Sequence, residues 1–228
     1  MKCVVLQPSY IPWRGYFYQI KQADLFIFYD DINYDKHGWR NRNRIRTDKG
    51  RRWLSIPVYS KGVETHQTRI NEINICWTKA WNKSHWSLIR RGYENAPFFD
   101  QYKDDISRFF QSHPRLFSDF DIETTIALTR LMGNRHTQFM KTSELEGITG
   151  TKTDRLIQIL QRVGADEYLS GPSAKDYVEL EKFDKAGIKF EYANYDFPEY
   201  PQLNALFDPQ LSILDLIFMT GPRAMEYF

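Results

Sequence analysis

Two short apolar runs near the N-terminus constrain the fold of this chain more than any other feature. The first, KCVVL, covers residues 2–6, and the second, LFIFY, covers residues 25–29. Neither run alternates apolar with polar residues, which is typical of strands covered on both faces of a parallel sheet. Residues 15–22 between them place Tyr16, Phe17 and Ile20 on one face of a predicted helix. Strand, helix and strand in about 30 residues form a βαβ unit with a right-handed crossover.

The rest of the chain continues the mixture of helices and strands. We therefore predict an α/β fold, a Rossmann-like three-layer parallel sheet with additional helices, in a single domain that spans residues 1–228. Helices dominate a segment around residues 78–163, and residues 30–44 are predicted to form a polar loop. The clearest helix covers 151–163 and stops at Gly164. The other predicted helices are 78–92, 101–110, 122–133, 175–186 and 212–219, and the other predicted strands are 53–58, 71–76 and 189–195.

Composition limits the classes of function. The net charge is +2, so no strong overall field favours nucleic acid or an anionic membrane. Two cysteines are too few for a disulfide framework or a zinc site. The first predicted strand leaves no room for a signal peptide, and no run of about 18 apolar residues is present, so we expect a cytoplasmic protein. Aromatic residues make up 16% of the chain, which suits a ring-rich core or a pocket that stacks flat ligands.

The turn after the first strand is the first candidate site. In a parallel α/β sheet, ligands bind beyond the carboxyl ends of the strands, and the first turn is the usual phosphate site. The alternative is that two prolines stiffen a loop whose rings plug the core, since no GxGxxG fingerprint is present. The candidate binding residues here are Gln7, Tyr10, Trp13, Gly15 and Tyr16.

Two aspartates follow the second apolar run. At the carboxyl end of a strand, Asp30 and Asp31 could orient or deprotonate an attacking amine, or bind Mg²⁺. A solvated turn is the commoner role of such a pair. A site is favoured if these residues and the first turn share one edge of the sheet.

A basic segment follows the aspartates. If it is extended, Arg40, Arg42 and Arg44 lie on one side, and Asn41 and Asn43 lie on the other. Arginine binds phosphate and carboxylate in a bidentate manner, so a small anionic substrate is one interpretation. A solvated basic hairpin is the alternative. Single-stranded nucleic acid, held between aromatic rings, is a third interpretation that the low net charge disfavours.

A small-residue turn near residue 170 is the next candidate. It has the pattern of a strand, a turn and a helix, so its backbone N–H groups and hydroxyls could hold a phosphate. An ordinary helix N-cap is the alternative. The candidate binding residues are Ser170, Gly171, Ser173, Lys175 and Tyr177, with Tyr200 and Gln202 from a later Pro-rich loop.

The histidines do not suggest a metal site. The five of them are scattered and lack HxxxH or HxH spacing, and no GxSxG or Cys–His nucleophile signature is present.

Several long motifs together resemble the WbqC-like family. They are QPSYIPWRGYF, ADLFIFYDDINYDKHGWRNRNRI, WLSIPV, YLSGPSAKDY and YPQLNALFDPQLSILDLIF with the following GP, and they cover residues 7–222. Members of that family occur among bacterial surface-polysaccharide genes, especially O-antigen (lipopolysaccharide) clusters. The resemblance implies transfer of glycine or another amino acid to an amino sugar.

The N-terminal βαβ unit is also similar to nucleotidylyltransferase-type folds, including pantothenate synthetase. Those enzymes activate a carboxylate with ATP and pass the acyl group to an amine. Their HxGH signature would fall on WRGY at 13–16, where only Gly15 carries over. Their serine-rich second loop would correspond to residues 170–173.

These features lead to two main functional hypotheses. One is an aminoacyl or acyl transferase that forms an amide on a nucleotide-linked amino sugar, with ATP and Mg²⁺ as candidate cofactors. The other is a non-catalytic protein that binds the same small molecules. Single-strand nucleic-acid binding ranks third, and the oligomeric state stays open.

Overall fold

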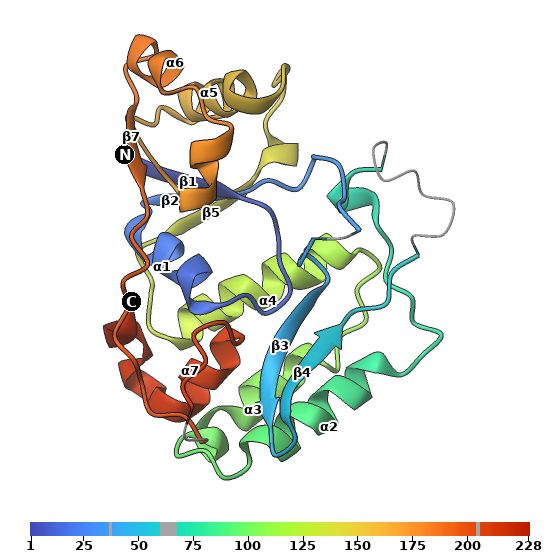
Figure 1. Cartoon of the computed structure of the whole chain (residues 1–228). Helices are drawn as coiled ribbons and strands as arrows, with labels where there is room; N and C mark the ends of the chain where they lie inside the picture. Colours follow the sequence, from blue (N-terminus) through green and yellow to red (C-terminus); the bar gives the residue numbers. More distant parts are fainter. Residues whose placement is uncertain (37, 60–67, 204–205) are drawn as a thin grey trace.

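A five-stranded parallel sheet lies at the centre of the upper half of the molecule (Figure 1). The computed structural model describes residues 1–36, 38–59, 68–203 and 206–228. The strand order is β5-β2-β1-β6-β7, and every pairing in it is parallel. The strands of this sheet are β1 (Lys2–Leu6), β2 (Leu25–Phe28), β5 (Gln138–Lys141), β6 (Glu167–Ser170) and β7 (Lys189–Tyr192). Helices cover both faces, which confirms the predicted Rossmann-like three-layer arrangement.

The helices are distributed around this sheet and below it. Their bounds are α1 (Arg14–Gln22), α2 (Trp81–Tyr93), α3 (Phe99–Phe109), α4 (Phe117–Leu131), α5 (Lys152–Val163), α6 (Leu180–Lys185) and α7 (Ile213–Thr220). Short 3₁₀ turns are η1 (Ile70–Glu72), η2 (Thr142–Glu144), η3 (Pro172–Asp176) and η4 (Gly221–Tyr227). Among the residues that the structure describes, no helix is both long enough and apolar enough to cross a membrane.

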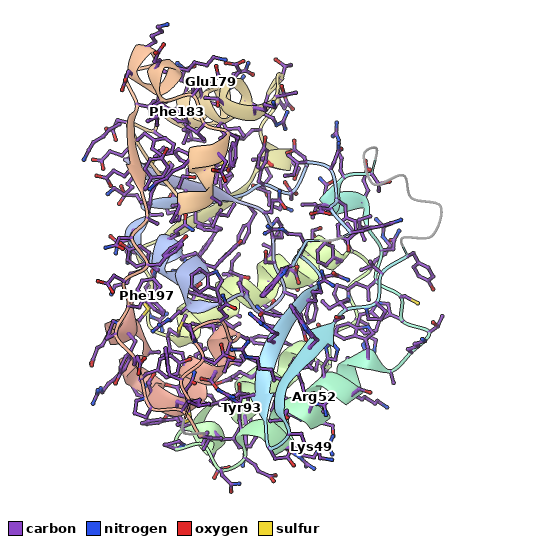
Figure 2. All side chains as sticks on the ribbon, viewed as in Figure 1. Lys49, Arg52, Tyr93, Glu179, Phe183 and Phe197 are labelled. Carbon is purple, nitrogen blue, oxygen red and sulfur yellow. The ribbon has the colours of Figure 1, made fainter. Side chains whose placement is uncertain are left out.

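The two faces of the sheet belong to two apolar clusters. Cys3 and Val5 of β1 face α5 and α6, and Phe183 of α6 is labelled in Figure 2. The ring of Phe183 packs parallel to that of Tyr168 with 5.6 Å between centroids. Val4 and Phe26 point the other way and join the larger cluster. Each strand therefore buries its side chains on both faces, which explains the uninterrupted apolar runs.

A second layer of structure lies below the sheet. The antiparallel hairpin of β3 (Arg42–Thr47) and β4 (Gly50–Ser55) packs on α2. Along β3, buried Asn43, Ile45 and Thr47 alternate with half-buried arginines. Gly92 of α2 lies so close to this strand that an added Cβ would be 2.4 Å from the carbonyl oxygen of Arg46. Ile45 shares the larger cluster with Val4 and Phe26 from the sheet, so one core connects the two layers.

Four predictions of secondary structure were wrong in part. The segment 30–44 is not entirely a loop, because β3 begins at Arg42 and its charged side chains occupy the outer face of a hairpin. Residues 71–76 form only isolated bridges and a 3₁₀ turn instead of a strand. The helix predicted at 175–186 begins at Leu180, since the N–H of Glu179 bonds to the hydroxyl of Thr153 in α5. The polar strand β5 was not predicted.

Candidate functional site

A pocket of about 460 Å³ opens at the carboxyl ends of three neighbouring strands. Leu6 ends β1 and Gln7 follows it, Tyr29 follows β2, and Tyr168 lies in β6. The strands on either side of β1 are β2 and β6. The order of the strands thus runs outward from β1 in both directions, which makes the end of β1 a topological switch point. Ligands of open α/β sheets bind at such a switch point, which makes this pocket the candidate site.

Two cations line the pocket. Arg40 comes from the segment before β3, and its Nη1 donates a hydrogen bond of 2.8 Å to Oγ of Ser9 in the first turn. Burial lowers the pKa of Arg40, yet a guanidinium remains charged at neutral pH. Lys152 is the first residue of α5 and has a φ of 51°, in the left-handed region that residues with a side chain rarely adopt. The pocket therefore offers positive charge beside the start of a helix.

Aromatic and hydroxyl side chains complete the wall. Tyr29, Tyr168 and Tyr177 line the pocket together with Ser173. Burial is the main cause that raises the pKa of Tyr29, Tyr168 and Tyr177. At neutral pH these phenols are therefore uncharged hydrogen-bonding groups beside a flat apolar surface.

The two aspartates are held by neighbours from η2 and α5. Oδ1 of Asp30 accepts from the backbone N–H of Ser143 at 3.0 Å, and its Oδ2 accepts from the Ser143 hydroxyl at 2.6 Å. Asp31 forms a largely buried ion pair with Arg155 at 2.5 Å and accepts a hydrogen bond of 2.7 Å from the Thr142 hydroxyl. These contacts tie the segment after β2 to η2 and α5. Their role as orienting or basic groups stays a prediction.

The predicted Mg²⁺ ligands do not fit a resident metal ion. The carboxylates of Asp30 and Asp31 are already neutralised or hydrogen-bonded by Arg155, Thr142 and Ser143. Among the described residues, no group of three or more His, Cys, Asp or Glu could hold a metal. His37 and His66 lie outside the described residues.

The first turn divides between the pocket and the core. Gln7 lines the pocket, and its carbonyl oxygen accepts from the Tyr16 hydroxyl at 3.0 Å. Tyr10 is fully buried, and its hydroxyl lies 2.8 Å from Nδ1 of His85 on α2. Trp13 packs edge-on against Tyr195 with 5.0 Å between centroids. Four residues of the turn thus have packing contacts, although the binding prediction named them together.

Gly15 has a steric role in this turn. A Cβ at Gly15 would lie 2.3 Å from the ring of Trp13, so the helix can start beneath this ring only with glycine there. In the structure, the group that Gly15 lets come close is the Trp13 side chain. That Gly15 also lets the backbone approach a ligand stays a prediction.

The Arg and Asn residues of the basic segment point in opposite directions. Nδ2 of Asn41 donates to the Ile56 carbonyl at 2.9 Å, and Nδ2 of Asn43 donates to the Ile11 carbonyl at 2.8 Å. These asparagines hold the hairpin to its neighbours. Arg42 and Arg44 lie against exposed tryptophans on the outer face of the hairpin.

The turn after β6 contributes only part of its predicted residues to the pocket. Ser173 and Tyr177 line it. Ser170 is buried at the end of β6, where its carbonyl accepts from Ala193, and Gly171 precedes η3. The Lys175 ammonium lies 5.2 Å from the ring centroid of Tyr192 and does not line the pocket.

Tyr200 and Gln202 belong to a separate buried network. The Tyr200 hydroxyl and Nε2 of Gln202 both donate to Oδ2 of Asp215, each at 2.8 Å. Asp208 accepts from Gln202 through its carbonyl, and its carboxylate pairs with Arg51 at 2.5 Å. This network fixes the loop before α7, and its residues are not among those lining the pocket.

Sequence reasoning missed Lys152 as a pocket residue and did not choose Arg40 among the candidate binding residues. The available signal for Lys152 was its place just after Gly150 and Thr151, at the start of the clearest amphipathic helix. In a βαβ unit such a helix starts near the carboxyl edge of the sheet. For Arg40, the signal was its strand-like alternation with Arg42 and Arg44.

Comparison with known proteins gives the family of this chain. The WbqC-like protein family matches residues 7–227, which is nearly the whole chain. The chain belongs to the WbqC-like protein family. This WbqC-like protein is also 39% identical over 229 residues to a protein of Mycobacterium tuberculosis (strain ATCC 25618 / H37Rv) that bears the name "Uncharacterized protein Rv1507c". The match covers 99% of this chain and 96% of the mycobacterial protein. No solved structure matches the chain.

Proposed function

We propose that the protein binds an anionic, nucleotide-linked amino sugar in the pocket and transfers an acyl or aminoacyl group to its amine. The observation that carries the proposal is that Arg40 and Lys152 line one pocket at the switch point of the sheet, together with Gln7 and Ser173. The membership in the WbqC-like family, whose members occur among surface-polysaccharide genes, supports the sugar and the acyl transfer.

The charge of the pocket favours an anion. Its described lining includes an arginine and a lysine but no carboxylate. Lys152 also begins a helix of 12 residues, whose first N–H groups carry partial positive charge. A phosphate or pyrophosphate fits this combination, because its oxygens accept hydrogen bonds from both cations and from the Ser173 hydroxyl.

The proposed reaction needs positioning more than an elaborate catalytic apparatus. The amine attacks the acyl carbon of an activated donor, the new N–C bond forms, the bond to the leaving group breaks, and the proton of the amine passes to the leaving group. Asp31 is the candidate group to orient the amine, because it lies two residues after Tyr29 of the pocket wall. Its carboxylate lies in an ion pair with Arg155.

The same pairing favours a second candidate function, binding without catalysis. Both aspartates are held by protein partners, and the described lining of the pocket has no carboxylate or imidazole that could serve as a base. A protein of this kind would present a nucleotide sugar to a partner enzyme.

Binding measurements on matched lysine variants test the site. We expect Lys152→Gln to raise the Kd of a UDP-linked amino sugar by about tenfold to a hundredfold, since it removes a charge-assisted contact. Lys175→Gln removes the same charge from a lysine that does not line the pocket, so it should leave the Kd unchanged. Equal effects of both variants, or no effect of either, would contradict the pocket as the binding site.

An assay with glycine, ATP and the same sugar separates the two candidate functions. Mass spectrometry of the sugar reports the mass gain of an amide, and Asp31→Asn should abolish that gain while it preserves the binding of the sugar. Tight binding without product from glycine or any other acyl donor would favour the non-catalytic function.

A further inference from the structure

The outer face of the β3–β4 hairpin carries two exposed tryptophans. Trp39 is 44% exposed and Trp53 is 47% exposed, with their rings edge to face and 4.8 Å between centroids. The guanidinium carbon of Arg44 lies 4.6 Å from the centroid of Trp39 and 5.3 Å from that of Trp53. The guanidinium carbon of Arg42 lies 5.4 Å from the Trp53 centroid. We call these four residues the Arg–Trp ledge.

The ledge is positively charged as well as aromatic. Nη2 of Arg44 donates to the neutral amide oxygen of Gln210 at 2.6 Å, which leaves its charge uncompensated by that contact. Asp208 pairs with the neighbouring Arg51 at 2.5 Å. Burial, and then repulsion from Arg51, lower the pKa of Arg44, while the Asp208 carboxylate opposes this shift. Exposed rings between arginines suit a ligand that is both flat and anionic.

The ledge lies next to the pocket along the chain. Arg40 lines the pocket, and Arg42 of the ledge follows two residues later. The Cα atoms of residues two apart are at most about 7 Å from each other. The pocket and the ledge are therefore adjacent along the backbone, which is the geometric basis for one extended ligand that reaches from one to the other.

We propose that the Arg–Trp ledge binds the nucleoside end of the ligand whose pyrophosphate and sugar lie in the pocket. The nucleobase stacks on an exposed tryptophan, and Arg42 and Arg44 lie on the nucleoside side of the pyrophosphate. A neutral sugar alone would use the rings but not the arginines, whereas a nucleotide uses both. This inference rests on the proposed function and adds the recognition of the base.

Calorimetric titration with two classes of probe tests the ledge. The probes are a set of UDP-, dTDP- and GDP-linked sugars, which carry a base, and inorganic pyrophosphate, which does not. We expect the double variant Trp39→Ala, Trp53→Ala to weaken the nucleotide sugars by about tenfold or more, because the stacking of one base is lost. Its affinity for pyrophosphate should stay that of the unmodified protein. Tyr59→Ala removes another aromatic ring, 55% exposed, and should change neither affinity.

Arg44→Gln provides a test that keeps both rings, in case the double variant disturbs the hairpin. It should also weaken the nucleotide sugars, with an unchanged circular dichroism spectrum. If neither variant alters nucleotide-sugar affinity while Lys152→Gln weakens it, the binding role of the ledge is refuted and the proposed function stands. If no nucleotide sugar binds, both proposals are refuted. Binding of a single-stranded oligothymidylate that depends on the tryptophans but not on Lys152 would assign the ledge to nucleic acid and overturn this inference.

Discussion

Asp215 makes the stability of the protein depend on pH in a direction that can be calculated. This carboxyl lies within α7, is 1% exposed, and accepts hydrogen bonds from Tyr200 and Gln202. Those bonds and a contact with Tyr93 favour its charged form, but burial outweighs them and raises its pKa to about 6. The usual value is 3.8. The folded protein therefore holds this proton more tightly than the unfolded chain does.

The sign of the effect follows from this difference. A raised pKa in the folded state contributes stability that is complete below pH 3.8 and is lost as the pH rises through 6. With these two values, linkage gives a contribution of about 2 kcal/mol at pH 4 and nearly none at pH 7. Asp215→Asn removes the titrating carboxyl, so the free energy of unfolding of this variant should lack the pH-dependent contribution of Asp215.

Urea denaturation of the unmodified protein and of Asp215→Asn between pH 4 and pH 7 measures this contribution to stability. The free energy of unfolding of the unmodified protein minus that of Asp215→Asn should fall by about 2 kcal/mol over this interval. Taking the difference cancels the other titrating groups. Asp100→Asn, on the exposed side of α3, is the control and should follow the unmodified protein. A difference that is constant with pH, or that rises with pH, would show that the hydrogen bonds to Asp215 outweigh its burial and would refute the reasoning.

Two further changes test the packing around the site. Gly92→Ala gains about 1 kcal/mol of helix propensity, but its Cβ would overlap the backbone of Arg46, so urea denaturation should show a net loss of about 2 kcal/mol. A stabilised variant would contradict the close packing of α2 on β3. Asp31→Asn leaves Arg155 largely buried without its ion pair and should cost about 3 kcal/mol by the same measurement. The exposed ion pair of Asp105 with Arg108 gives the control, since Asp105→Asn should lower the free energy of unfolding by less than about 1 kcal/mol. Equal losses in the two variants would show that burial does not strengthen the Asp31 pair.

The sequence alone determined the class of the fold. The apolar runs at 2–6 and 25–29 need cover on both faces, and a parallel sheet with helices on each side provides it. The helix at residues 152–163 was predictable for the same reason, because its apolar face and Gly164 are local signals. Strand β5 carried no such signal, since its polar residues are stabilised by pairing with β2 at the edge of the sheet.

The tertiary structure decided which candidate residues meet in one pocket. Gln7, Ser173 and Tyr177 line it, whereas Tyr200 and Gln202 instead bind Asp215 in a separate network. The type of a residue shows what it can bind but not which way its side chain points. That direction depends on contacts between residues far apart in the chain, such as Arg40 with Ser9 and Asp31 with Arg155. Local sequence therefore predicts the edge of the sheet where the pocket opens, and long-range packing selects the residues that line it.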